Sequence, residues 1–63
     1  MHRAEQFNEG DRIRWNGPGG PVTGYVVIED GEKRVYMNGG KSFRLEDLLG
    51  ASSLEVTGKV RIR

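Results

Sequence analysis

The sequence predicts an all-β domain in which five short antiparallel strands curl into a small barrel, with one short 3₁₀ or α turn before the last strand. Apolar and polar residues alternate along five segments, and this period of two is typical of a half-buried strand. Clusters of Gly, Pro, Asn and Asp separate the segments and indicate turns. One cluster holds an Asp-Gly pair between two alternating segments, which is the strongest short-range signal for a β-hairpin.

The chain has 63 residues, so it is predicted to form one domain near the lower end of what folds alone. Residues 1–9 are polar apart from Phe7, and they are expected to be a frayed N-terminal arm in which Phe7 plugs one end of the core. Residues 10–63 are expected to be the barrel domain. Only 35% of the residues are hydrophobic and ten are glycine, so the core is expected to be thin and association to stabilise it.

The composition argues against several classes of protein. There is no cysteine, which removes disulfides and thiolate metal sites and favours a reducing, cytoplasmic setting. No segment approaches the ~20 apolar residues that span a bilayer, and the N-terminus lacks the apolar core of a signal peptide, so no membrane partner is predicted. The net charge of +1 does not by itself indicate a nucleic-acid binder, so any electrostatic argument depends on where the charges lie.

The first strand is predicted over residues 11–15, where Ile13 and Trp15 alternate with Arg12 and Arg14. The two apolar side chains then face the core, and the two arginines face water or a partner. The next six residues contain three glycines and two prolines, so they are predicted to form a loop that continues neither strand nor helix.

The second strand is predicted over residues 22–28, and Gly24 marks a bulge or a close backbone approach that bends it. The Asp30-Gly31 pair then turns the chain, and the third strand covers residues 33–37. Along both strands, apolar residues fall mainly on one face and polar residues on the other. The outward side chains of these strands include Tyr25, Arg34 and Tyr36.

A fourth strand at residues 41–45, a single turn at residues 46–49 and a long fifth strand at residues 54–63 complete the predicted fold. The fifth segment alternates without a break, which places Lys59 and Arg61 on the outward face. The predicted core consists of the inward apolar residues Ile13, Trp15, Val26, Ile28, Val35, Phe43, Leu45, Leu48, Val56 and Val60.

Four segments of the sequence, EGDRIRW, GYVV, EDGEKRVY and FRLEDL, resemble the Tudor-like and KOW-like domains of bacterial proteins, which are SH3-like small barrels. The resemblance covers roughly residues 7 to 50. It implies an SH3-like barrel and the partners that such barrels commonly bind, namely nucleic acid, ribosomal or polymerase components, or peptides. Because many functions share this fold, the resemblance predicts architecture more strongly than activity.

A more distant likeness is to the plasmid-borne type II dihydrofolate reductase, an SH3-like barrel that builds its active pore only as a tetramer. Asp11 and Arg12 match the GDR opening of that family. The pore residues of the family, a Val-Gln-Ile-Tyr run, have no counterpart, because the comparable stretch here is Ser42-Phe43-Arg44-Leu45. A non-catalytic module is therefore predicted, and a pore enzyme formed by oligomerisation stays a distant alternative.

The candidate binding residues are cations and aromatics predicted on the outer face of the sheet. Guanidinium groups contact phosphates and aromatic rings stack on bases, so such a face suits single-stranded nucleic acid or a nucleotide-like anion. The alternative is an ordinary solvated exterior, in which the arginines pair with Glu29, Glu32, Glu46 or Glu55. The candidate residues are Arg12, Arg14, Tyr25, Arg34, Tyr36, Arg44, Lys59 and Arg61.

Two other features indicate no chemistry. Gly39-Gly40-Lys41-Ser42 resembles the end of a phosphate-binding loop, but the first glycine of that spacing falls on Val35 and no helix of adequate length is predicted after it. His2 is the one histidine and lies in the polar N-terminus, so neither a metal site nor a histidine-based catalytic pair is predicted within one chain. No cofactor and no catalytic residue are predicted.

The second functional hypothesis is a protein partner, with the chain acting as an adaptor or as a homo-oligomer. The long fifth strand offers residues 57–63 for pairing with another copy, and the Gly/Pro loop is the other predicted contact. Lysine and arginine at this edge oppose open-ended pairing. A closed dimer or small ring is therefore predicted.

Overall fold

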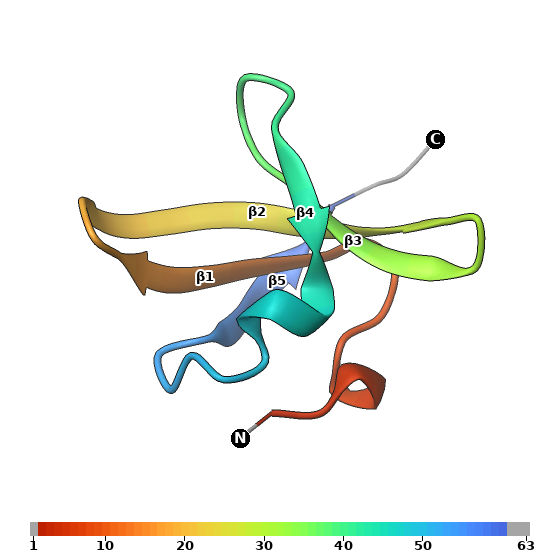
Figure 1. The fold of residues 1–63 in the computed structure, drawn as a ribbon, viewed down its shortest axis with the longest axis horizontal. Helices are drawn as coiled ribbons and strands as arrows, with labels where there is room; N and C mark the ends of the chain where they lie inside the picture. Colours follow the sequence, from red (N-terminus) through yellow and green to blue (C-terminus); the bar gives the residue numbers. More distant parts are fainter. Residues whose placement is uncertain (1, 61–63) are drawn as a thin grey trace.

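The computed structural model describes residues 2–60, in which five antiparallel strands form one sheet in the order β4-β3-β2-β1-β5 (Figure 1). Two 3₁₀ turns, η1 (Ala4–Gln6) and η2 (Leu45–Leu48), are the helical elements of the described residues. The prediction of an all-β fold with one short turn before the last strand is confirmed. The strands are β1 (Asp11–Gly17), β2 (Gly20–Glu29), β3 (Glu32–Tyr36), β4 (Ser42–Arg44) and β5 (Glu55–Lys59).

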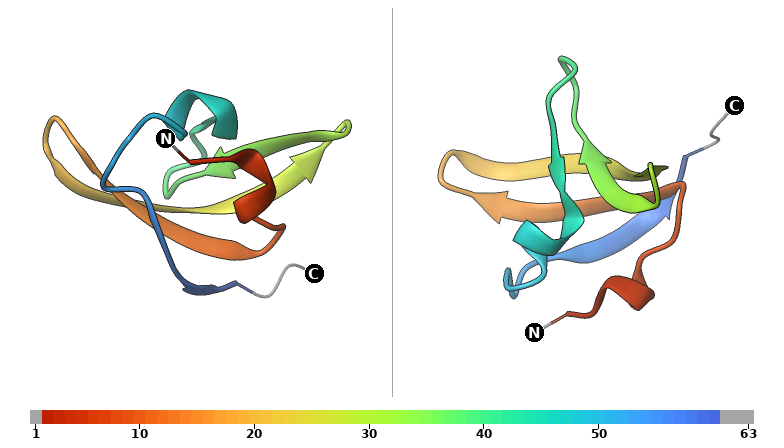
Figure 2. Two further views of the ribbon diagram at one scale, coloured as in Figure 1. Left: turned by 90° about the horizontal axis from the view of Figure 1, so that it is seen from below. Right: turned by 45° about the vertical axis from the view of Figure 1, so that its right-hand side comes forward.

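The sheet curls strongly but its hydrogen-bonded ladder is open. β4 runs across β1 and β2, and η2 follows it over one face of the sheet (Figures 1 and 2). Because β4 and β5 stand at opposite ends of the strand order, no ladder among residues 2–60 closes the sheet on itself. The closed barrel and the likeness to SH3-like domains therefore stay predictions.

The prediction of a six-residue loop between the first two strands is wrong. β1 and β2 continue to pair through Asn16 with Pro21 and Gly17 with Gly20, so only Pro18 and Gly19 form the turn. Pro21 lies in the part of β2 that pairs with β1 alone. Because the other side of the strand has no neighbour there, a proline, which lacks the backbone N–H, is tolerated. The result is one long, narrow hairpin instead of a separate loop.

The second hairpin follows its prediction. Asp30 and Gly31 both have positive φ, 52° and 76°, as the two-residue turn between paired Glu29 and Glu32 requires. The backbone of β3 lies close to Gly24, because a Cβ added there would lie 2.8 Å from the Tyr36 carbonyl oxygen. The close approach predicted at this glycine is confirmed.

The core lies between the inner face of the sheet and the covering segments. Three predicted core residues are wrong. Ile28 is 45% exposed, Val56 is 48% exposed, and Val60 lies beside Arg12 and Tyr25 on the side of the sheet away from the core. Ile28 lies near the tip of the projecting β2–β3 hairpin, and Val56 lies on the edge strand β5 opposite Ile13 (Figure 1). Leu48, Phe43 and Val60 are only partly buried. The buried apolar residues are Phe7, Ile13, Trp15, Val26, Val35, Leu45 and Leu54.

The prediction that the N-terminal segment is frayed is wrong for residues 2–9, because this segment is held against the core. Phe7 is 2% exposed, as the predicted plug requires. The Lys33 ammonium donates to the carbonyl oxygens of Ala4 at 2.9 Å and Phe7 at 2.7 Å, and the His2 N–H donates to the Leu49 carbonyl at 2.9 Å. The segment that precedes β1 therefore closes one side of the core.

A bulge changes the face to which β5 side chains point. Arg12 pairs with Gly58 and Ile13 with Val56, so Thr57 is an extra residue that stands opposite no residue of β1 in the register. The unbroken alternation predicted for residues 54–63 is therefore wrong at Thr57. β5 ends at Lys59, and the last part of the predicted strand, residues 61–63, lies outside the described residues.

Candidate anion-binding face

The outer face of the sheet is the side opposite the core, and the strand register defines which residues share it. Arg12 pairs with Tyr25, Tyr25 with Tyr36, and Tyr36 with Ser42. Because directly opposed residues of antiparallel strands lie on the same face, these four side chains form one row across four strands. Alternate residues such as Ile13 and Val26 are buried on the other face. The sequence correctly predicted Arg12, Tyr25 and Tyr36 on the outer face.

The two tyrosines of this row form an ordered aromatic pair. Their ring centroids are 6.1 Å apart and the ring planes are inclined by 24°. The Tyr36 hydroxyl donates to Glu29 Oε2 at 2.5 Å, and this hydrogen bond is the main reason that the pKa of Tyr36 is raised above its ordinary value. Tyr36 is therefore neutral at physiological pH and its ring is held in place.

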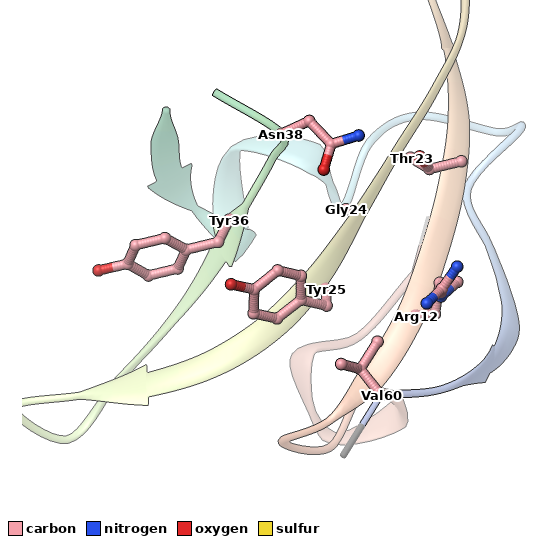
Figure 3. Close-up of a pocket in the computed structure, with 7 residues that line it drawn as sticks. All are labelled: Arg12, Thr23, Gly24, Tyr25, Tyr36, Asn38 and Val60. Atoms are coloured by element: carbon pink, nitrogen blue, oxygen red, sulfur yellow. The ribbon is translucent and has the colours of Figure 1, made fainter. Parts of the chain in front are cut away.

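Arg12 stands beside the tyrosine pair at an open hollow of about 180 Å³. Figure 3 shows the Tyr36 and Tyr25 rings next to one another, with Arg12 and Val60 beyond Tyr25 and Asn38 at the upper side. Arg12 is exposed and has no carboxylate partner among residues 2–60. The hollow thus combines an uncompensated guanidinium group with an aromatic surface. Its lining residues are Arg12, Thr23, Gly24, Tyr25, Tyr36, Asn38 and Val60.

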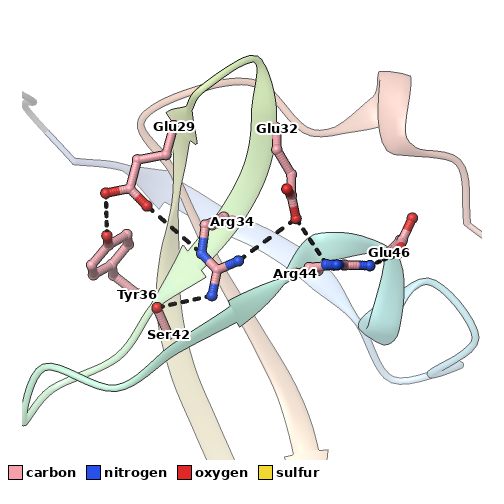
Figure 4. A network of polar contacts seen from close by, with 7 residues as sticks. All are labelled: Glu29, Glu32, Arg34, Tyr36, Ser42, Arg44 and Glu46. Carbon is pink, nitrogen blue, oxygen red and sulfur yellow. Dashed lines mark hydrogen bonds and ion pairs between the residues drawn. The ribbon is translucent and has the colours of Figure 1, made fainter.

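Arg34 and Arg44 also lie on the outer face, but they are joined to carboxylates (Figure 4). Arg34 lies 3.7 Å from Glu29 and 3.6 Å from Glu32, and it donates to the Ser42 hydroxyl at 3.2 Å. Arg44 lies 3.1 Å from the same Glu32 oxygen and 3.2 Å from Glu46.

The Glu46 hydrogen bond is the main cause that raises the pKa of Arg44 above its ordinary value. For Arg34 and Arg44, the structure matches the solvated exterior that the sequence left open as an alternative. Their positive charges are balanced by neighbouring carboxylates, so neither guanidinium group is free in the way that Arg12 is.

Of the remaining predicted cations, Arg14 lies on the predicted face and Lys59 does not. Arg14 is on the outer face, with its guanidinium 2.5 Å from the Glu55 carboxylate. Lys59 was predicted on the same face, but the bulge places it opposite Asp11, and its ammonium lies 2.9 Å from the Asp11 carboxylate. Asp11 is buried, so Lys59 acts as its partner at the edge of the core. Arg61 lies outside the described residues.

Four residues of the hollow were missed as candidates, and Gly24 is the one among them without a side chain. Thr23 and Asn38 supply polar groups, and Val60 supplies an apolar wall. The signal for Thr23 was present, because it alternates in phase with Tyr25. The sequence indicates only a turn at Asn38, and its place at the hollow depends on the path of the chain after β3.

A second hollow lies on the core side, where the covering of the sheet is incomplete. It is an open, mainly apolar groove of about 410 Å³. Its floor contains Trp15 and Phe43, whose rings meet edge to face with centroids 5.7 Å apart. The groove is lined by Trp15, Gly17, Pro18, Val22, Met37, Phe43, Asp47 and Leu48.

Comparisons of the chain with protein-family models, curated proteins and solved structures found no match. Among residues 2–60, no three His, Asp or Glu side chains gather in a way that could hold a metal ion. None of the helical turns in that range has the length and apolar character needed to cross a membrane.

Proposed function

We propose that this chain is a small non-catalytic binding module that holds nucleic acid or a nucleotide-like anionic ligand at the hollow beside Arg12. The observation that carries the proposal is the position of Arg12. It is a cation without a carboxylate partner among the described residues, and it stands next to the Tyr25–Tyr36 pair on the same face.

The chemistry of the hollow suits the two parts of a nucleotide. A guanidinium group forms charge-assisted hydrogen bonds with phosphate oxygens, and a tyrosine ring offers a surface on which a base stacks. Thr23 and Asn38 add a hydroxyl and an amide at the rim of the hollow. The Glu29 carboxylate holds Tyr36 in position, so part of the aromatic surface is ordered before a ligand arrives.

The proposal is tested with a fluorescently labelled, mixed-sequence single-stranded oligonucleotide at low salt, with fluorescence anisotropy as the readout. The Arg12→Ala variant should bind about tenfold more weakly, because a hydrogen bond to a charged group contributes roughly 1.5–3 kcal/mol. Arg14→Ala is the matched control, since Arg14 lies on the same strand and face but is paired with Glu55. Its affinity should stay within about threefold of the parent's. Equal losses for the two variants, or parental binding by Arg12→Ala, would reject the site.

The second candidate function is protein interaction, and the apolar groove is the observation that favours it. The groove leaves Val22, Met37, Phe43 and Leu48 only partly covered. Pro18 at its rim belongs to the Gly/Pro segment that the sequence predicts as a contact. The partner proposed for this groove is a second copy of the chain. The distant alternative, a pore enzyme, requires the same kind of assembly.

A further inference from the structure

The outer face carries different charge at its two ends. Beyond Tyr36, the two arginines of this face, Arg34 and Arg44, are contacted by three carboxylates, those of Glu29, Glu32 and Glu46, so negative charge is in excess around them. In the other direction along β1, Arg14 is balanced by Glu55. Arg12 is thus the one cation of this face, within residues 2–60, that lacks a carboxylate partner.

We propose that the hollow takes a single nucleotide unit, with one phosphate at Arg12 and one base on Tyr25, and does not track a continuous strand. This inference rests on the proposed function and chooses between its two ligand classes. A strand that continued past Tyr36 would bring its next phosphate toward Glu29, which already accepts the Tyr36 hydroxyl. Like charges at close range are repelled, so the acidic end of the face stops the strand.

The size of the hollow agrees with this limit. Its volume of about 180 Å³ is below the ~300–1,000 Å³ of pockets that enclose drug-sized ligands. A hollow of this size accepts the ring of one base against Tyr25, with the phosphate at its open side beside the exposed Arg12. Proteins that follow single strands use a continuous basic groove with repeated aromatic platforms. The described face offers one tyrosine pair and one uncompensated arginine.

The first test compares adenosine 5′-monophosphate with oligo(dA) of two, four and eight nucleotides, by NMR titration of the parent chain. Affinity expressed per nucleotide should stay within about twofold across the series, because each molecule offers the same single unit. The slope of log K against log salt should have a magnitude of about one, as expected for one phosphate. A tenfold rise by the octamer, or a slope of about three or more, would overturn the single-unit limit while leaving the proposed function in place. Absence of binding by every probe would overturn the proposed function itself.

The second test removes the acidic barrier. One Glu32 oxygen contacts both arginines, at 3.6 Å from Arg34 and 3.1 Å from Arg44, so Glu32→Gln releases both from this carboxylate. Affinity for the octanucleotide should rise at least about threefold, and affinity for the mononucleotide should stay within about twofold. Glu5→Gln makes the same change in net charge on the exposed surface of η1 and should alter neither. Equal gains for the two variants would show that net charge alone matters and would reject the acidic barrier.

Discussion

Asp11 shows how one buried charge is stabilised in so small a fold. Burial, the largest influence, raises the pKa of its carboxyl, but a hydrogen bond from the Asn8 N–H and the nearby Lys59 ammonium outweigh it, so the pKa is lowered. The Asn8 N–H belongs to the N-terminal segment, and Lys59 belongs to β5. Asp11 thus ties the N-terminal segment and β5 to the start of β1.

The lowered pKa of Asp11 predicts a pH-dependent contribution to stability. A depressed pKa in the folded state stabilises the fold above the unfolded pKa, and this stabilisation is lost as pH falls through the folded pKa. Asp11→Asn should therefore lower the free energy of unfolding by about 1–3 kcal/mol at pH 7, and by less at acid pH where the parent carboxyl is protonated. Urea denaturation at both pH values measures this.

The control for this prediction is Glu55→Gln, which alters the exposed pair with Arg14 and should cost at most about 1 kcal/mol. A destabilisation by Asp11→Asn that is the same at both pH values would contradict the electrostatic explanation. It would leave a packing role for the side chain instead.

At the scale of the elements, the pairing of β2 with β3 decides where the candidate site forms. The register places Tyr36 beside Tyr25, and Gly24 leaves room for the end of β3, after which Asn38 reaches the hollow. An alanine Cβ at Gly24 would lie 2.8 Å from both the Tyr36 carbonyl oxygen and Val35 Cγ1. Because one of these neighbours is backbone, it cannot simply rotate away.

Gly24→Ala should therefore destabilise the fold by about 1–3 kcal/mol through overpacking, measured as a lower denaturation midpoint. Gly58→Ala is the matched control on β5, since an added Cβ there meets nothing within 4 Å. It should change stability by no more than about 0.5 kcal/mol. Similar midpoints for the two variants would show that the β2–β3 contact relaxes and does not depend on glycine.

For the whole molecule, two surfaces compete as contacts for a second copy. The edge strand β5 is short within the described residues, and it carries the bulge at Thr57 and the charged Glu55 and Lys59. These features are the ones by which proteins protect a sheet edge from pairing. The apolar groove around Val22 has no such protection, so it is the better contact for self-association.

If self-association is the function, the chain should sediment above its monomer mass of 7.0 kDa at micromolar concentration. Val22→Lys places a charge in the groove and should return the monomer, because burying an unpaired ammonium is costly. Thr57→Lys on β5 should leave the association unchanged. A mass of one chain at every concentration would remove both the dimer and the pore enzyme that depends on assembly.

Local chemistry in the sequence determined the class of the fold, the five strands and the Asp30-Gly31 turn, because strand alternation and turn conformation depend on neighbouring residues. It also placed Arg12, Tyr25 and Tyr36 on one face.

Only the tertiary structure decided which cations on that face lack partners. The bulge at Thr57 moved Lys59 to Asp11, and the pairing of β3 with β4 brought Glu32 to Arg44. Strand register and ion pairing link residues far apart in the chain. An alternating pattern in the sequence does not show which distant residues will lie next to one another. The contrast between Arg12, which has no carboxylate partner, and the paired arginines could therefore come only from the folded molecule.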